Sequence, residues 1–212
     1  MPFPKSNTAT PSCKICHKPI EVNSIFSLIF TPKAVCLHCF LSLNPKYYRW
    51  RFQGVDCYAI YPYSPEYRNL IYLYKGCGDM ELGPTFIERV GSYFRIKFRG
   101  YVIVPAPSHP NKVRERGFDH LPFMFKSLGL PIIPAIEKTD DVKQSDLNAE
   151  QRRHIGDHLR FVPGSKIKGK KILLVDDVFT TGSTMRACLG ILRKHKAGKI
   201  AILVVAKVVD RH

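Results

Sequence analysis

Acidic residues are scarce in this chain. Its 212 residues include 17 Asp and Glu against 33 Lys and Arg, which gives a formal net charge of +16 at pH 7. A charge this large is well beyond that of a neutral enzyme and indicates a polyanionic partner. That partner can be a nucleic acid, a phosphorylated substrate or an anionic membrane surface, and charge alone does not choose among them.

Long apolar runs are missing as well. The longest early one, residues 25–30, is far too short to span a bilayer, and residues 1–13 lack the apolar core of a signal peptide. We therefore expect a cytoplasmic protein with no transmembrane segment of its own. Hydrophobic residues still make up 45% of the chain, enough for the core of one ordinary domain with a small additional module.

Four of the seven cysteines form two Cys-x-x-Cys pairs with 19 residues between them. They are Cys13, Cys16, Cys36 and Cys39. The spacing predicts a four-thiolate structural zinc site, because a cytoplasmic chain is not expected to form disulfides. The alternatives are a haem attachment sequence, since His17 follows the first pair, and a redox dithiol, but neither explains the second pair. The other cysteines are expected in the core: Cys57, Cys77 and Cys188.

Three parts are expected along the chain: a tail over residues 1–11, a zinc module over 12–45 and an α/β domain over 46–212. Strands are predicted at residues 55–60, 101–104, 132–133, 172–175 and 199–209. Helices are predicted at residues 66–75, 80–98, 113–128 and 183–195, with at most one more in the polar stretch 137–158. This alternation predicts a parallel sheet flanked by helices, with ligands at the carboxyl ends of its strands.

Residues 172–184, ILLVDDVFTTGST, combine a buried strand, a carboxylate pair and a hydroxyl-glycine turn that opens a helix. Asp176 and Asp177 can accept hydrogen bonds from neighbouring sugar hydroxyls. The turn can hold a phosphate with backbone amides and hydroxyls, and its members are Thr180, Thr181, Gly182, Ser183 and Thr184. This segment therefore predicts a phosphorylated ribose as the ligand.

Two other interpretations of the same segment are possible. In an ATP site, Asp176 would be the acidic partner of a Walker A loop, for which the nearest candidate is residues 164–171. That stretch has Lys171 where Ser or Thr must bind magnesium, and it enters a strand instead of leaving one. In a purely structural role, a strand-end Asp caps the next helix, but a cap needs only one acid and no full hydroxyl-glycine run.

The sequence LLVDDVFTTGST resembles the phosphoribosyl pyrophosphate signature of type I phosphoribosyltransferases. VPAPSHPNKVRERGFDHL and KQSDLNAEQRRHI resemble the ComF competence family, whose members join a Cys-x-x-Cys zinc module to such a domain. The resemblance covers almost the whole chain, from Cys13 to about Val209. It implies a type I phosphoribosyltransferase-like α/β fold preceded by the four-cysteine zinc module.

The resemblance also implies roles for particular residues in binding phosphoribosyl pyrophosphate. The acid pair would engage the ribose and the turn at 180–184 the 5-phosphate. On the pyrophosphate side the implied residues are Ala106, Pro107, Ser108, Arg114 and Arg116. Magnesium is expected between pyrophosphate and ribose, held mainly by ligand oxygens and water. The family usually has Asn-Gln after Gly-Phe, where this chain has Asp119 and His120.

Two functions follow from the resemblance. The first is a competence protein that binds phosphoribosyl pyrophosphate and handles or imports single-stranded DNA in natural transformation, together with DNA-uptake machinery at the inner membrane. The second is a catalytically active phosphoribosyltransferase of nucleotide metabolism. The motif alone does not certify turnover, because this chemistry needs no protein nucleophile and no acceptor pocket is recognisable.

A basic and aromatic segment, KYYRWRF, follows the zinc module. Its candidate DNA contacts are Lys46, Tyr48, Arg49, Trp50 and Arg51, since bases stack on rings while cations follow the phosphates. The alternative is a strand whose rings alternate inward with the arginines outward. Several histidines near the predicted site are expected to be surface or hydrogen-bonded residues and not general bases: His109, His120, His154 and His158.

Overall fold

The computed structural model describes residues 11–20, 34–139 and 159–209. They fall into two compact units that divide between Asn44 and Pro45. The smaller unit contains two cysteine-bearing turns and helix α2 (Leu37–Ser42), which begins directly after Cys36. The larger unit is a mixed α/β structure with a parallel sheet, so the predicted fold class is confirmed.

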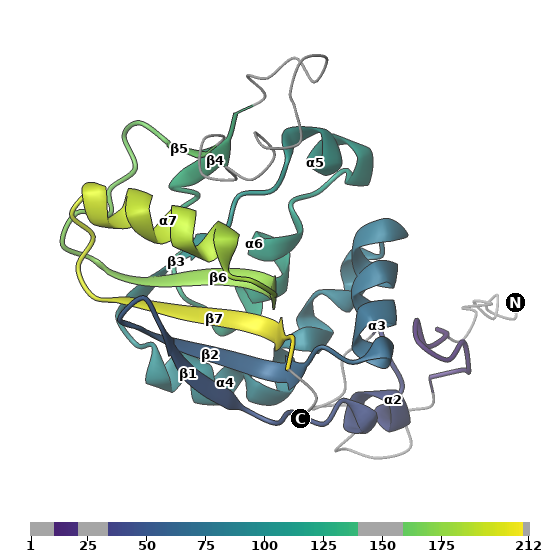
Figure 1. Ribbon diagram of the computed structural model, residues 1–212. Coiled ribbons are helices and arrows are strands. Elements are labelled where there is room, and N and C mark those ends of the chain that lie inside the picture. The colour runs from purple at the N-terminus through teal and green to yellow at the C-terminus, as the bar shows by residue number, and fades with distance from the viewer. Residues whose placement is uncertain (1–10, 21–33, 140–158, 210–212) are drawn as a thin grey trace, which may run out of the picture. The chain divides into compact units, whose positions relative to one another are not determined.

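A five-stranded sheet forms the centre of the larger unit (Figure 1). Its strands are β1 (Tyr48–Phe52), β2 (Val55–Pro62), β3 (Tyr101–Pro105), β6 (Lys171–Phe179) and β7 (Ile200–Lys207). Their order is β1-β2-β7-β6-β3; the last four are parallel, and β1 pairs antiparallel with β2. The inner strands β6 and β7 are nearly continuous apolar runs because helices cover both of their faces.

The helices of this unit are α3 (Pro65–Gly76), α4 (Glu88–Lys97), α5 (Pro110–Arg116), α6 (His120–Phe125) and α7 (Ser183–Lys194). Short 3₁₀ turns occupy Met80–Leu82, Pro84–Phe86 and Lys126–Leu128, and β4 (Ile136–Lys138) pairs antiparallel with β5 (Leu159–Phe161). Figure 1 shows α7 along one face of the sheet and α4 behind the other. In the same view the carboxyl end of β6 is directed toward α3. The last turn of α3 lies beside the predicted ligand site, since Lys75 contacts Asp177.

Two predicted helices are wrong in their extent. The segment 80–98 is helical only from Glu88, because Gly83 and Pro84 interrupt it and leave two 3₁₀ turns. The segment 113–128 is divided at Gly117, whose φ of 79° ends α5 and redirects the chain into α6. This break matters for the site, since it turns His120 at the start of α6 inward.

Three smaller expectations also need correction. Residues 132–133 do not form a regular strand, and only Ile132 makes an isolated bridge, to Ile103. Strand β6 continues to Phe179, so the acid pair lies within the strand and not after it. Cys77 is exposed at the end of α3, whereas Cys57 and Cys188 are buried as predicted.

Candidate functional site

The acid pair lies near the carboxyl end of β6, between its neighbours β3 and β7. The backbone N–H of Asp177 donates to Oδ1 of Asp176 at 2.9 Å. Asp177 is buried, and its Oδ2 lies 2.5 Å from Nζ of Lys75 at the end of α3. A charge-assisted contact of this length holds the Asp177 carboxylate in one orientation at the edge of the sheet.

The two carboxyl groups differ in their readiness to ionise. Burial, followed by the neighbouring charge of Asp177, raises the pKa of Asp176 well above its ordinary value. Burial also opposes ionisation of Asp177, but the Lys75 ammonium and His120 outweigh it, and the pKa of Asp177 is lowered. Asp177 therefore holds the negative charge of the pair more readily than Asp176 does.

His120 connects the acid pair to the predicted pyrophosphate side. Its Nδ1 lies 3.0 Å from Nη1 of Arg116 and 3.3 Å from Oγ of Ser108. Because a guanidinium only donates, Nδ1 must be the acceptor, and the proton is on Nε2. Nε2 is buried, has no hydrogen-bond partner among the described residues, and is 4.0 Å from Oδ2 of Asp177. Burial, then the cation of Lys75, lowers the pKa of His120 to about 3.

Asp119 joins the same group of side chains, since Oγ of Ser108 donates to its Oδ1 at 3.0 Å. The two residues that depart from the family pattern, Asp119 and His120, thus both contact Ser108. We call these residues the His120 cluster: Lys75, Ser108, Arg116, Asp119, His120 and Asp177. It gathers groups from α3, from β6 and from the segment that runs from the end of β3 through α5 to the first residue of α6.

The hydroxyl-glycine turn begins α7 next to this edge. Gly182 has a φ of 75° and precedes the first residue of the helix, so the free N–H groups of the first turn open there. Oγ1 of Thr181 and Oγ of Ser183 lie 2.9 Å apart, and Thr180 and Thr181 are exposed. A Cβ on Gly182 would lie 2.6 Å from Cζ of Phe179 and 2.7 Å from Cζ of Phe52. Only glycine fits this position.

Not all residues predicted on the pyrophosphate side come together. Arg116 points into the His120 cluster, whereas Arg114 is exposed and donates to Oδ1 of Asn111 within α5. Ala106 is buried and its N–H donates to the Val175 carbonyl, so it continues the sheet. Pro107 is half-buried in the same turn.

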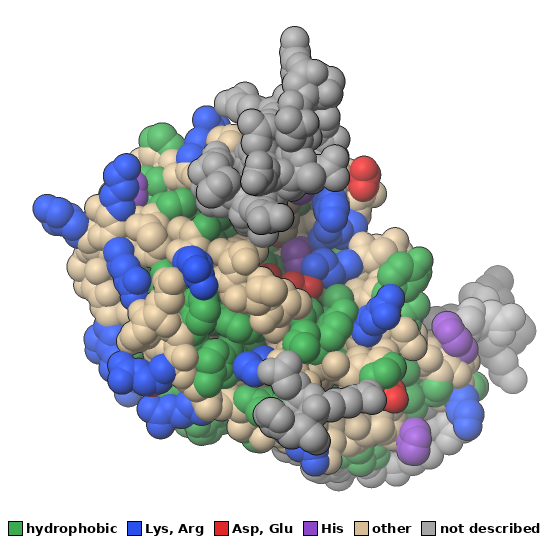
Figure 2. Space-filling model, viewed as in Figure 1, with side chains coloured by type: hydrophobic (Ala, Val, Ile, Leu, Met, Phe, Trp, Pro, Cys, Tyr) green, Lys and Arg blue, Asp and Glu red, His purple; other side chains and the backbone are tan. Residues whose placement is uncertain are grey.

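A pocket of about 720 Å³ opens beside the His120 cluster. Its charged lining residues are Arg68, Lys75, Lys112, Glu115 and Arg116. Figure 2 shows acidic side chains at the bottom of a hollow with basic and histidine side chains next to them. Four cations against one carboxylate give this pocket a positive potential, which suits a polyanionic group.

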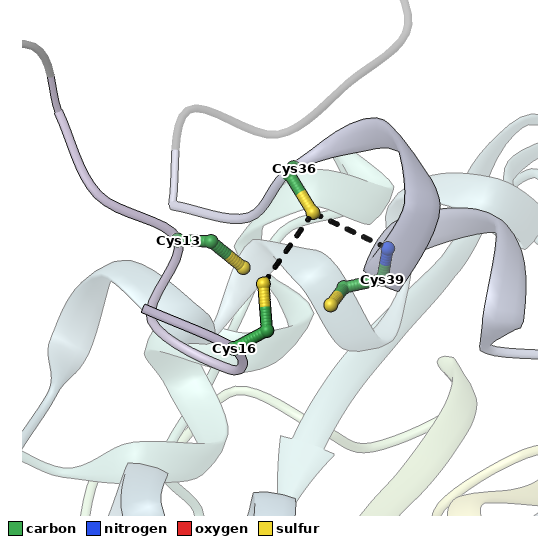
Figure 3. Close-up of side chains that lie close together, drawn as sticks. All are labelled: Cys13, Cys16, Cys36 and Cys39. Atoms are coloured by element: carbon green, nitrogen blue, oxygen red, sulfur yellow. Dashed lines mark hydrogen bonds between the residues drawn. The ribbon is translucent and has the colours of Figure 1, made fainter. Parts of the chain in front are cut away.

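The four predicted zinc ligands lie together in the smaller unit (Figure 3). The sulfur atoms of Cys13, Cys16, Cys36 and Cys39 are all within 4.8 Å of one another. The N–H of Ile15 donates to Sγ of Cys13 at 3.4 Å, and that of Cys39 to Sγ of Cys36 at 3.5 Å. Amide donors and four converging sulfurs are the usual arrangement around a tetrahedral thiolate-bound ion, so this cluster could hold zinc.

The basic and aromatic segment forms β1, with the inward alternation that the structural alternative predicted. Trp50 is half-buried, with its ring 5.1 Å from that of Phe179, and Phe52 lies 5.2 Å from the same ring. Arg49 and Arg51 are exposed on the other side of the strand, and Arg49 pairs with Asp56 at 3.4 Å. The Trp50 side chain therefore serves chiefly to pack against Phe179.

Comparisons with known proteins agree with this fold. Residues 122–212 match the family model described as phosphoribosyl transferase domain. Competence protein ComFC of Streptococcus pneumoniae (strain ATCC BAA-255 / R6) is 30% identical over 133 residues, 62% of this chain and 59% of that protein. The predicted resemblance to the ComF family is confirmed. The chain thus matches less than two thirds of the length of this ComFC protein.

Two phosphoribosyltransferases are similar over shorter or more divergent stretches. Orotate phosphoribosyltransferase of Coccidioides immitis (strain RS) is 39% identical over 44 residues, 21% of this chain and 18% of that protein. The structure of adenine phosphoribosyltransferase from Saccharomyces cerevisiae is 13% identical, with a TM-score of 0.43, and the match covers 80% of this chain and 88% of that chain.

None of the described helices has the length and apolar character needed to cross a membrane.

Lys75 and the inward position of His120 are the features that sequence reasoning missed. Lys75 belongs to no motif, and it meets Asp177 only because α3 ends at the carboxyl edge of β6. His120 follows Gly117 closely, and the glycine in RERGF was the available signal that the chain turns there. Its buried, unpartnered Nε2 depends on packing and has no signature in the sequence.

Proposed function

We propose that this ComF relative binds phosphoribosyl pyrophosphate with magnesium and handles single-stranded DNA during natural transformation. One observation carries the first part: the acid pair lies in the last four residues of β6, and the turn that follows this strand opens α7. Carboxylates for a sugar diol and amides for a phosphate are thereby presented a few residues apart.

In this proposal each part of the ligand has its own partners. Asp176 and Asp177 accept hydrogen bonds from the ribose hydroxyls, and the turn from Thr180 to Thr184 holds the 5-phosphate. Arg116 faces the diphosphate, and its planar guanidinium suits two phosphate oxygens at once. The excess of cations around the adjacent pocket supports this direction for the diphosphate. Magnesium would bind between diphosphate and ribose, mainly through ligand oxygens and water.

Lys75 then acts as a second cation of the site. It neutralises Asp177 at 2.5 Å while its side chain is 28% exposed toward the pocket. When ribose hydroxyls bind to Asp177, the ammonium is free to turn toward the pocket and the diphosphate, because the four-carbon stem of lysine is flexible. His120 supports the same arrangement by holding Arg116 through Nδ1.

The four-cysteine cluster is proposed to bind one structural zinc ion. Four thiolates fill a tetrahedral coordination sphere and leave no open position, so the ion would stabilise the turns and not activate a substrate. Support comes from the convergence of all four sulfurs within 4.8 Å. The pKa of Cys13 is about 7, because amide and thiol hydrogen bonds lower it against the opposing effect of burial.

The DNA part of the proposal is supported by the net charge of +16 and by the exposed arginines of β1. Phosphate contacts from Lys46, Arg49 and Arg51 would make binding strongly dependent on salt. Tyr48 and Trp50 are half-buried, which leaves them less of their faces for bases than the sequence suggested.

Titration with phosphoribosyl pyrophosphate and magnesium tests the ligand, and a screen for pyrophosphate release tests turnover. The screen offers free bases, amines and single-stranded DNA as acceptors. We expect binding without robust release with a free base. Efficient transfer to a free base would instead make this chain a phosphoribosyltransferase of nucleotide metabolism and would contradict the proposal of a DNA-handling protein.

A further inference from the structure

A second, smaller pocket lies on the α4 side of the sheet, away from the acid pair. It has a volume of about 160 Å³, and its lining comes from β1 and the residue before it, from β2 and from α4. Its aromatic residues are Tyr47, Tyr48, Tyr58, Tyr93 and Phe94, and its cations are Arg49 and Lys97. We call it the tyrosine slot. It shares no lining residue with the pocket beside the His120 cluster.

The rings of the slot are arranged to accept a further planar group. Tyr47 and Tyr93 meet edge to face, with centroids 6.0 Å apart and planes at 72°. They are 50% and 52% exposed, so about half of each side chain is available to a partner. Phe94 closes the inner side, 6.4 Å from Tyr47, and is buried. Aromatic faces at such an angle leave an open face for stacking.

Positive charge lies directly over these rings. Nζ of Lys97 is 4.6 Å from the centroid of Tyr58 and 5.6 Å from that of Tyr93. Arg49 lies 5.9 Å from the Tyr58 centroid, although it also pairs with Asp56. No acidic residue is among the described lining residues of the slot. Rings and cations in one pocket suit a ligand that is aromatic and anionic at once.

The backbone holds Tyr47 in an unusual conformation. Its φ is 52°, in the left-handed region that a residue with a large side chain rarely adopts. The N–H groups of Lys46 and Tyr47 both donate to the Ile60 carbonyl, at 2.9 and 3.2 Å, which fixes the chain there. Strain of this kind is retained where the surrounding structure requires a particular side-chain direction. Here it directs the Tyr47 ring toward Tyr93.

We propose that the tyrosine slot stacks a base of single-stranded nucleic acid, with Lys97 and Arg49 contacting the adjoining phosphates. This inference rests on the DNA part of the proposed function and assigns that contact to Tyr47 and Tyr93 in place of the packed Trp50. An aliphatic partner would gain nothing from the two cations. A small phosphorylated metabolite without an aromatic ring would leave the ring faces of the slot uncovered.

Binding of the full-length protein to a fluorescent oligothymidylate, and to an abasic oligonucleotide of the same length, tests the slot. Tyr93→Ala should weaken binding of the oligothymidylate about tenfold and leave the abasic strand unaffected, since only a base can stack. Tyr93→Phe should retain the wild-type affinity, because the ring face is preserved. Lys97→Ala should weaken both ligands and reduce the salt slope by about one.

Ile96→Ala is the matched control, because Ile96 is 77% exposed on the same helix and does not line the slot. It should change neither affinity, and all four variants should keep the wild-type affinity for phosphoribosyl pyrophosphate. The proposal is overturned if Tyr93→Ala binds oligothymidylate as tightly as Ile96→Ala does, or if wild type binds the abasic strand equally well. If wild type binds neither strand, the DNA part of the proposed function fails together with the slot, while the metabolite titration still tests the other part.

Discussion

Lys75 and Asp177 are 102 residues apart in the sequence, yet Nζ of the lysine lies 2.5 Å from Oδ2 of the aspartate. The contact joins the end of α3 to the carboxyl edge of β6. It favours ionisation of Asp177, because the ammonium helps to lower the pKa of this carboxyl, whereas burial raises the pKa of Asp176. The site is thereby prepared to exchange one cation for ligand hydroxyls.

Replacement of Lys75 by methionine should therefore affect both stability and binding. The Asp177 carboxylate would be left buried without its partner, and its pKa should rise. Since 28% of the Lys75 side chain is exposed, we expect a loss of about 2 kcal/mol, less than for a fully buried pair. Urea unfolding and metabolite calorimetry measure the two effects. Lys112→Met, in the same pocket, is the control and should leave the stability unchanged.

A pH experiment tests the state of His120. Its pKa is about 3 in the folded protein, lowered first by burial, against about 6.5 for an unperturbed histidine. The unfolded chain therefore takes up the proton first, so stability is complete above pH 6.5 and declines as the pH falls toward 3. Between pH 7 and pH 4.5 the wild type should lose on the order of 2 kcal/mol more than His120→Gln, as measured by urea unfolding. Equal losses in the two proteins would show that His120 is not buried as a neutral group.

Two glycines of the same region provide a matched pair. Gly182→Ala combines a φ of 75° with contacts of 2.6 and 2.7 Å to Phe179 and Phe52, so the turn must distort. We expect at least a tenfold loss of affinity for phosphoribosyl pyrophosphate, since the amides of the turn move with it. Gly190 lies within α7, and a Cβ added there meets nothing within 4 Å. Gly190→Ala should therefore be neutral or slightly stabilising. Calorimetry on both variants checks this, and similar affinities would argue against a role for the turn.

Metal analysis tests the cysteine cluster. The purified protein should contain one zinc per chain, and Cys36→Ser should contain far less, because three thiolates hold the ion more weakly. Cys188→Ser, at a buried cysteine outside the cluster, should keep the full metal content. Elemental analysis of the three proteins gives the answer directly. A full complement of zinc in Cys36→Ser would place the metal elsewhere.

The sequence was sufficient wherever a local pattern decides the structure. The apolar run before Asp176 predicted β6, and the glycine after Thr181 predicted the turn that starts α7. The two Cys-x-x-Cys pairs predicted a cluster that the structure brings together. Each of these features depends on neighbours within a few residues or on a fixed spacing, so no knowledge of the tertiary fold was needed.

Features that depend on contacts between distant segments were not predictable in this way. Arg114 and Arg116 are both arginines of the same motif, but only Arg116 is directed toward His120, because α5 ends at Gly117. The packing of Trp50 on Phe179 likewise requires β1 to lie at the edge of the sheet beside β2. The surroundings of these side chains depend on the order of the strands in the sheet, which cannot be read from a single sequence.

Isothermal titration calorimetry with phosphoribosyl pyrophosphate and Mg²⁺ is the most direct test of the proposed ligand site. Wild type should bind one molecule per chain, and the double variant Asp176→Asn with Asp177→Asn should show no binding while retaining a folded circular dichroism spectrum. Absence of binding heat for folded wild type over a range of temperatures, or equal affinity in the double variant, would contradict the assignment of this site.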